Sequence, residues 1–316
     1  MYKPEVFTID SRDGKTKLHC EKLVPSGKVR AILIVAHGMN EYFDRYHEMS
    51  EFLEGEGILV AGLDHLGHGH TAEAQGESGY FADRDGATVL VRDVHRLKKT
   101  IESDYPGVPV FVMGHSMGSF IIRNYINVYG RGIKGAILMG SGWRSVCEVK
   151  AGRILAKFMG KIKGRHSRSL FLTALIMKKY GESFPVEDGP LGWICSIPDI
   201  RNEFEVDPLR GDDFTIGAYN DLIDLALRAE DFRRASMIPS ELPLLLLSGE
   251  DDPVGDFGKG VEQTAQFYRN AGIRDVIVKL YKGNRHEVYH DRDRYASFMD
   301  IIHFMEDHGV EKAGSN

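Results

Sequence analysis

The sequence predicts an α/β fold built on a doubly wound, mostly parallel sheet, and three observations lead to this expectation. Short apolar runs alternate with amphipathic stretches of helical period along most of the 316 residues. The runs at 31–36 and 244–247 are apolar throughout, as expected for strands that are buried on both faces. The alternation stops between about residues 142 and 237, where the pattern is helical and irregular. We therefore expect a core of residues 1–141 and 238–316, with a helical cap, or lid, inserted at 142–237.

The first predicted element is an antiparallel hairpin, with strands at 6–9 and 17–20 around a turn at 11–14. The later apolar runs predict buried strands at 31–36, 58–64, 108–113, 133–139, 244–247 and 276–281. Amphipathic stretches between them predict helices at 45–54, 87–103, 119–129, 261–270 and 294–306. Strands that alternate with helices favour parallel pairing, so we expect a mostly parallel sheet with an antiparallel hairpin at its N-terminal end.

Composition excludes several classes of protein. The net charge of −6 and the pI of about 6.1 give no overall basic field that would recruit nucleic acid. Cys20, Cys147 and Cys195 are too few and too widely spaced for a disulfide framework or a zinc site. The first ten residues hold no apolar stretch of signal-peptide length, and no run of ~18 apolar residues occurs. We expect a soluble, cytoplasmic protein; its oligomeric state is not indicated.

The most specific motif is Gly114-His115-Ser116-Met117-Gly118, which follows the predicted strand at 108–113 and precedes the predicted helix at 119–129. A serine in G-x-S-x-G between a strand and a helix forms a nucleophile elbow, a turn so tight that glycine is needed on both sides. The hydroxyl then projects above the sheet at a helix N-terminus, where negative charge is favoured. The other interpretation is a glycine-flanked turn in which the serine only caps the helix.

A serine hydroxyl needs a base, and the base needs an orienting acid. Candidates for both follow the last two predicted strands, whose carboxyl ends meet the elbow at one edge of a parallel sheet. We assign His286 as the general base, with His290 as its nearest competitor. We assign Asp252 as the acid, with Asp251 and Asp256 as alternatives.

Two backbone N–H groups are candidates to bind an oxyanion. The first is that of Met117, the residue after the candidate nucleophile, and the second is that of Met39, in the loop after the strand at 31–36. Gly38 lets this loop turn in closely. His37 lies in the same loop, and we interpret it mainly as a packing residue.

Taken together, these residues resemble the α/β-hydrolase superfamily and, within it, the monoglyceride lipase/lysophospholipase group, also called the serine aminopeptidase-like hydrolases. The resemblance spans nearly the whole chain and rests on His37-Gly38-Met39-Asn40-Glu41, Asp64-His65-Leu66-Gly67-His68-Gly69, the serine motif, Gly249-Glu250-Asp251-Asp252-Pro253-Val254 and His286. It implies the α/β-hydrolase fold, a triad of Ser116, Asp252 and His286, oxyanion donors at Met39 and Met117, and neither metal nor cofactor.

Two positions depart from the group's pattern, because Asn40 stands where the group usually has glycine and Leu66 where it often has arginine. In the cap, Trp193 and the stretch 207–215 also resemble the group.

The cap is unusual in charge. Residues 149–181 hold nine Lys or Arg and no Asp or Glu, and an apolar stripe of helical spacing runs from Ala151 to Ile162. A basic amphipathic helix can contact a lipid surface, and its apolar face could line an acyl-chain tunnel. Leu155, Phe158, Met159 and Trp193 are therefore the candidate substrate-binding residues of the cap. The ordinary alternative is that the stripe packs on the core and the lysines are solvated.

The resemblance and the candidate triad lead us to expect a serine hydrolase that cleaves small acyl monoesters through an acyl-enzyme, such as a monoacylglycerol lipase, lysophospholipase or carboxylesterase. An aminopeptidase is the first alternative, and it would need acidic groups for the substrate ammonium. The cap offers Glu187, Asp188, Glu203 and Glu205. The second alternative is a ligand-binding receptor of the same fold that turns over little.

Overall fold

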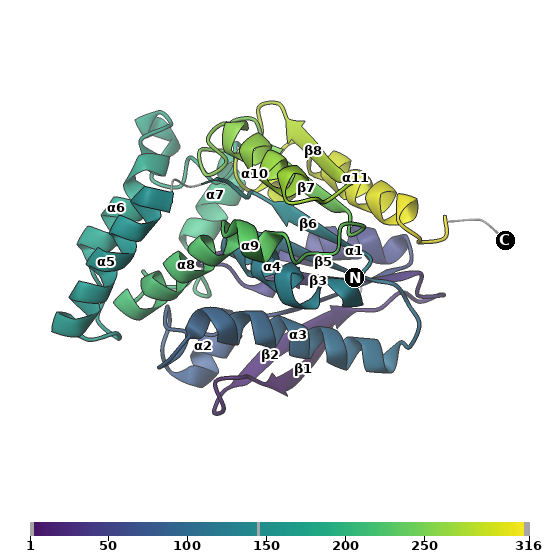
Figure 1. Ribbon diagram of the computed structural model, residues 1–316, viewed down its shortest axis with the longest axis horizontal. Coiled ribbons are helices and arrows are strands. Elements are labelled where there is room, and N and C mark those ends of the chain that lie inside the picture. Colours follow the sequence, from purple (N-terminus) through teal and green to yellow (C-terminus); the bar gives the residue numbers. More distant parts are fainter. Residues whose placement is uncertain (1–2, 144–145, 313–316) are drawn as a thin grey trace.

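The computed structural model describes residues 3–143 and 146–312, and its described strands form one eight-stranded sheet in the order β1-β2-β4-β3-β5-β6-β7-β8 (Figure 1). The antiparallel pairs are β1 with β2 and β2 with β4, and all later neighbours are parallel. This confirms the predicted mostly parallel sheet with an N-terminal hairpin. The strand bounds are β1 Glu5–Asp10, β2 Lys17–Leu23, β3 Ala31–Ala36, β4 Ile58–Leu63, β5 Val110–His115, β6 Gly135–Met139, β7 Leu244–Gly249 and β8 Val276–Tyr281.

The predicted helices of the core are present with small shifts of their ends. They are α1 His47–Gly55, α3 Gly86–Asp104, α4 Met117–Tyr129, α10 Lys259–Asn270 and α11 Arg294–Asp307. The sequence pattern did not predict α2 Gly69–Gln75 or the short 3-10 helices η1 Phe43–Tyr46, η2 Gly130–Gly132 and η4 Val288–His290.

Helices cover both faces of the sheet because alternate side chains of the buried strands point to opposite sides. On β3, Ile32 and Ile34 belong to one apolar core, to which α3, α4, α8 and α10 contribute. Leu33 and Val35 belong to a second core, to which α1 and α11 contribute. The continuous apolar strands that the sequence showed are thus buried on both faces.

The segment between β6 and β7 is helical. It contains α5 Val146–Lys163, α6 Leu170–Gly181, η3 Val186–Asp188, α7 Pro198–Glu205, α8 Ile216–Ala229 and α9 Phe232–Ala235. Helix α5 packs against α8, and Figure 1 shows α5 and α6 at the left end of the molecule. Within the described residues, no helix has the length and apolar character needed to cross a bilayer.

Candidate active site

Ser116 lies in the sharp turn that joins β5 to α4, and its backbone is strained. Its φ of 51° and ψ of −116° fall in a region that non-glycine residues rarely adopt. A Cβ atom on Gly114 would come within 2.2 Å of the carbonyl oxygen of Gly118, and one on Gly118 within 2.0 Å of that of Ala36. Both neighbours in the motif must therefore be glycine, as the elbow requires.

Asp252 and His286 come together at the carboxyl ends of β7 and β8. The Nδ1 atom of His286 lies 3.0 Å from each carboxylate oxygen of Asp252. Asp252 is completely buried, and it also accepts hydrogen bonds from the N–H of Val254 at 2.8 Å and the hydroxyl of Ser248 at 3.0 Å. Burial alone would raise the pKa of this carboxyl, but His286 and these two donors outweigh it and lower the pKa. The carboxylate is therefore ionised at neutral pH.

This contact fixes the tautomer of His286. Because Asp252 is an acceptor, Nδ1 of His286 carries the proton and donates it, and Nε2 keeps its lone pair. Nε2 is buried and has no hydrogen-bond partner among the described residues. The backbone N–H of His286 donates to the carbonyl of Trp193 at 3.3 Å, and the two rings lie 5.1 Å apart. A residue of the helical segment between β6 and β7 thus helps to hold the imidazole in place.

The competing candidates lie elsewhere. Asp251 and Asp256 are exposed. His290 contacts Glu287 at 3.0 Å and Arg45, rather than the Asp252 carboxylate. His37 is completely buried; its Nε2 accepts the N–H of His65, and burial lowers its pKa to about 4. It packs in the loop as a neutral residue.

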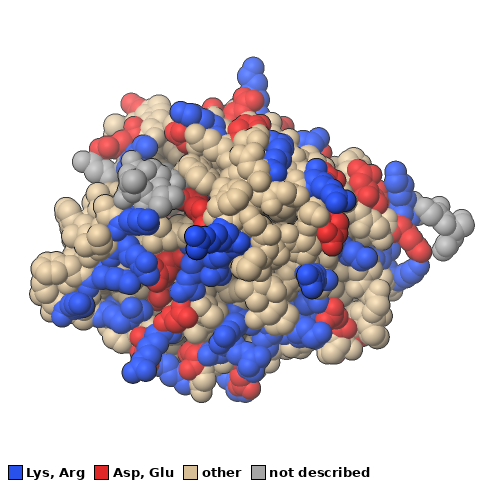
Figure 2. All heavy atoms as spheres, viewed as in Figure 1, with Lys and Arg blue, Asp and Glu red and all other residues tan. Residues whose placement is uncertain are grey.

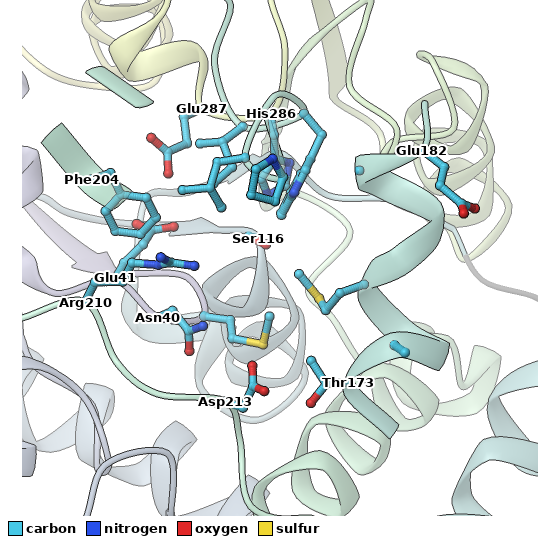
Figure 3. Close-up of a pocket in the computed structure, with 18 of the residues that line it drawn as sticks. Asn40, Glu41, Ser116, Thr173, Glu182, Phe204, Arg210, Asp213, His286 and Glu287 are labelled. Carbon is cyan, nitrogen blue, oxygen red and sulfur yellow. The ribbon is translucent and has the colours of Figure 1, made fainter. Parts of the chain in front are cut away.

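Ser116 and His286 both line one cavity of about 640 Å³, a size typical of ligand pockets (Figure 3). Most of the other lining side chains are apolar. They come from the loop after β3 and from the helical segment between β6 and β7, and include Met39, Leu170, Ala174, Met177, Leu191, Trp193, Ile194 and Phe204. A hydroxyl and an imidazole thus belong to the lining of one largely apolar cavity.

The four residues between β6 and β7 that the sequence predicts to bind substrate lie in different surroundings. Trp193 lines the cavity. Leu155 and Met159 instead pack against the main core, and Phe158 is exposed to solvent, so α5 does not form the cavity wall. Helix α6 takes that place, with Leu170, Thr173, Ala174 and Met177 at helical spacing toward the cavity.

The loop after β3 holds Met39 at the cavity and explains one departure from the resemblance. Asn40 has a φ of 60°, in the left-handed region that favours glycine and that asparagine tolerates better than most other residues. Met117 opens α4, where backbone N–H groups have no acceptor within the helix. The second departure, Leu66, is completely buried in the main core.

A buried charged pair lies under the elbow, and sequence reasoning gave it no role. Glu41 and His115 are both buried, with 2.7 Å between Oε1 and Nδ1. The other ring nitrogen of His115 lies 3.3 Å from the carbonyl oxygen of His286. The second oxygen of Glu41 accepts the hydroxyls of Tyr46 and Tyr289 at 2.7 and 2.9 Å.

Both nitrogens of His115 face acceptors, which favours the doubly protonated ring. Burial opposes that charge, but Glu41 outweighs burial and raises the pKa of His115. The pair therefore ties the loop after β3 to the strand before Ser116 and to the backbone of His286. The only sequence signal for the pair is that Glu41 and His115 each lie within a motif that the chain shares with the monoglyceride lipase group.

The fold and this site define a class. A mostly parallel eight-stranded sheet, a strained serine after its strand β5, an aspartate after β7 and a histidine after β8 are the features of an α/β-hydrolase. Residues 27–293 match the family described as serine aminopeptidase, S33, and the chain belongs to that family. It is a hydrolase of the monoglyceride lipase-like group.

Individual relatives agree with this placement. The monoglyceride lipase of Mus musculus is 28% identical over 311 residues, covering 94% of this chain and 89% of that protein. The monoacylglycerol lipase of Mycolicibacterium smegmatis is 25% identical and covers 93% of this chain and 95% of its own. Among solved structures, a thermostable carboxyl esterase from Bacillus coagulans, in complex with glycerol, superposes with a TM-score of 0.91. It is 30% identical, covering 98% of this chain and 99% of its own.

Proposed function

We propose that the protein hydrolyses carboxylic esters with Ser116 as nucleophile, His286 as general base and Asp252 as the orienting acid. The observation that carries this proposal is the geometry of His286. Its Nδ1 is held by Asp252 while its buried Nε2 has no partner among the described residues, in the same cavity as Ser116. An imidazole held this way is prepared to accept the serine proton.

In the first half-reaction, the Ser116 oxygen bonds to the ester carbonyl carbon as its proton moves to Nε2 of His286. The N–H groups of Met39 and Met117 stabilise the negative oxygen that forms. The bond from carbon to the alcohol oxygen then breaks, and the alcohol leaves with the proton from His286. In the second half, water attacks the acyl-enzyme, His286 takes and returns the proton, and the acid is released.

Ser116→Ala tests this mechanism. We expect the variant to lose ester hydrolysis by about 10⁶-fold, or to the level of background, while its melting temperature stays close to that of the wild type. A fluorophosphonate probe should label the wild type and not the variant. Failure of the folded wild type to label would favour a ligand-binding receptor, and retained hydrolysis in the variant would refute the mechanism.

The proposed substrates are acyl monoesters such as monoacylglycerols, lysophospholipids or simple carboxylic esters. The largely apolar wall supports an acyl chain, and the named activities of the mouse and mycobacterial relatives support the class of substrate. We further propose that residues 142–237 act as a cap that encloses the acyl chain of the substrate, because α6 and Trp193 form part of the cavity wall.

Met177→Trp tests the position of the acyl chain. Met177 lines the cavity from α6, so the bulkier indole ring of tryptophan should occupy space that a long acyl chain needs. We expect kcat/KM for long-chain p-nitrophenyl esters to fall about tenfold or more, and kcat/KM for the acetate ester to stay unchanged. Phe171→Trp, on an exposed position of the same helix, is the matched control. A wild-type preference for acetate over octanoate, or equal losses for both esters in Met177→Trp, would contradict an acyl-binding cavity.

An aminopeptidase activity remains the second candidate, because Glu182 and Asp213 line the cavity and could receive an ammonium group. The carboxylates proposed from the sequence do not line it. Glu187, Glu203 and Glu205 are exposed, and Asp188 pairs with Arg201 and Arg285. Amino-acyl naphthylamides assayed beside fatty esters distinguish the two activities.

We also propose that α5 rests on an anionic lipid surface. Ile154, Phe158 and Ile162 recur at intervals of four residues and are 62–72% exposed. Lys157, Lys161 and Lys163 are exposed beside them, and Figure 2 shows Lys and Arg gathered at this end of the molecule. Exposed apolar side chains with basic neighbours are suited to the boundary between headgroups and acyl chains.

Sedimentation with lipid vesicles tests this contact. Vesicles that contain phosphatidylglycerol should bind the protein, and vesicles of phosphatidylcholine alone should bind it less. The double variant Phe158→Ser and Ile162→Ser should bind less than the wild type while it keeps its activity on soluble short esters. Equal binding by wild type and variant would exclude α5 as the contact.

A further inference from the structure

Three histidines and two carboxylates form a cluster at strand β2. None of these five residues lines the cavity that holds Ser116 and His286. The cluster consists of His19 and Glu21 on β2, Asp44 on η1, His47 on α1 and His70 on α2. Candidate ligand atoms of His19, Asp44 and His70 all lie within 4.8 Å of one another. The same holds for Glu21, Asp44 and His47, so Asp44 belongs to both sets.

The two carboxylates of this cluster differ in their hydrogen-bond partners. Glu21 is nearly buried and is satisfied, since its oxygens contact Nε2 of His19 at 2.8 Å and Nε2 of His47 at 2.7 Å. Asp44 differs: its carboxyl group lies against that of Glu21, and its buried Oδ1 atom receives no hydrogen bond from a donor group of the described residues. A buried carboxylate oxygen without a donor is costly, and a cation beside it would remove that cost.

The cluster is held in place from behind by Asp64, a completely buried carboxylate. Asp64 accepts the backbone N–H of Phe43, the neighbour of Asp44, at 2.8 Å and that of His70 at 2.9 Å. One side chain therefore fixes the two elements that carry Asp44 and His70.

His70 is also oriented through its side chain. Its Nδ1 contacts Oε2 of Glu73 at 3.0 Å, and its Nε2 faces Oδ2 of Asp44 at 3.9 Å. Histidines that bind a metal through one ring nitrogen usually donate the N–H of the other ring nitrogen to a carboxylate or carbonyl, which holds the ring in position. Nδ1 of His70 makes such a contact with Glu73 and leaves Nε2 directed at Asp44.

We propose that this cluster binds one divalent transition-metal ion of the zinc class, with Asp44 as the ligand common to both sets. Imidazole nitrogens together with carboxylate oxygens are the ligands such ions prefer, at about 2.0–2.2 Å. Rotation of the side chains would bring the ligand atoms to these distances. An ion can reach three of these side chains from solvent. His47, Asp44 and His70 are 31%, 34% and 36% exposed.

The consequence of binding is structural. The ion would join β2 to η1 and α2, and η1 begins four residues after Met39 in the loop that carries a proposed oxyanion donor. Because binding to the folded state alone raises stability, the ion should raise the melting temperature. The ester chemistry proposed above does not depend on it.

Titration calorimetry of zinc chloride into tag-free protein, stripped with a chelator and kept in a non-coordinating buffer, tests the proposal. The wild type should bind about one equivalent saturably, and its melting temperature should rise with zinc. Asp44→Asn, which keeps the shape and removes the charge, should weaken binding about tenfold or more; Glu73→Gln should weaken it less. His166→Gln is the matched control, since His166 pairs with Glu77 at 2.8 Å outside the cluster and its loss should change nothing.

Cobalt provides a second readout, because its visible absorption reports ligands directly. The wild type should give an absorption band with cobalt chloride that Asp44→Asn lacks. Should Asp44→Asn fail to fold, His70→Gln on the more exposed side of the cluster replaces it. Absence of saturable zinc binding by the wild type, or equal affinity in the folded variants, would show that the cluster is a network of protonated histidines and carboxylates, and would overturn the proposal.

Discussion

Replacing Asp252 with asparagine removes one charge from the site while leaving its shape almost unchanged. In the native protein the carboxylate accepts three hydrogen bonds, from His286, Val254 and Ser248. An asparagine can still accept from Val254 through its oxygen. Its amide nitrogen, a donor, replaces the other oxygen that lies 3.0 Å from Nδ1 of His286, which favours the ring with Nδ1 as the acceptor and the proton on Nε2.

The size of the effect follows from that change of tautomer. With a proton on Nε2, His286 cannot take the proton of Ser116, and kcat should fall about 10⁴-fold, or about 5.5 kcal/mol of transition-state stabilisation. Ser248→Ala is the comparison within the same network. It removes one neutral hydrogen bond to Asp252 and leaves the tautomer as it is, so it should cost about tenfold or less.

The assay is steady-state hydrolysis of a p-nitrophenyl ester by wild type, Asp252→Asn and Ser248→Ala, each first shown to be folded by its melting transition. We expect the loss to appear in kcat rather than KM, because the tautomer affects proton transfer and not substrate binding. Equal, small losses in both variants would refute this reasoning and would reduce Asp252 to one of several acids around the imidazole.

Three further predictions concern stability. Gly118→Ala should lower the free energy of unfolding in urea by about 3 kcal/mol or more, because its Cβ would lie 2.0 Å from the Ala36 carbonyl oxygen. Gly27→Ala, whose Cβ would have no atom within 4 Å, should change this free energy by less than about 0.5 kcal/mol. Equal effects of the two substitutions would contradict a tightly packed elbow. Glu41→Gln should cost about 3 kcal/mol at neutral pH because it leaves a buried histidine without its partner charge, and an unchanged midpoint would show that the pair carries no charge. Burial lowers the pKa of His68 to about 3, so between about pH 6.5 and pH 3 the unfolded state binds more protons than the folded state. In this range the free energy of unfolding falls by about 1.4 kcal/mol for each pH unit that the pH drops, for this group. His68→Gln should show a shallower dependence of unfolding free energy on pH, and identical slopes for variant and wild type would refute the assignment.

The strands and the triad candidates could be predicted from sequence because their signals are local. Each buried strand is a continuous apolar run, and the edge at which parallel strands end places Ser116, Asp252 and His286 together without knowledge of any contact. The segment after β7 offers three carboxylates, Asp251, Asp252 and Asp256, and the sequence analysis assigns Asp252 as the acid. The structure gives a reason for it, since only Asp252 is buried against the imidazole.

Helix α2 could not be predicted because no apolar period marks it. Local polar contacts hold it instead, as when the Thr71 hydroxyl donates to the carbonyl of Asp64 and Gln75 accepts the N–H of Gly67. The Glu41–His115 pair was also beyond reach, because its members lie 74 residues apart and their pairing depends on the fold.

The apolar stripe of α5 predicted a helix but not its orientation. The stripe is wider than one packed face, and the structure divides it. Leu155 and Met159 pack inward, and Ile154, Phe158 and Ile162 face solvent. A single helix pattern cannot show which half meets the core, and it gives no sign that α6 supplies the cavity wall instead.

The most direct test of the central claim is to identify the residue that becomes acylated. The wild type is mixed with a slowly hydrolysed acyl ester, quenched in acid during the first turnovers, digested and analysed by mass spectrometry. We predict one acyl group per chain, on Ser116, and none in Ser116→Ala. An acyl group on another residue, or rapid hydrolysis with no acyl adduct on Ser116, would contradict the account.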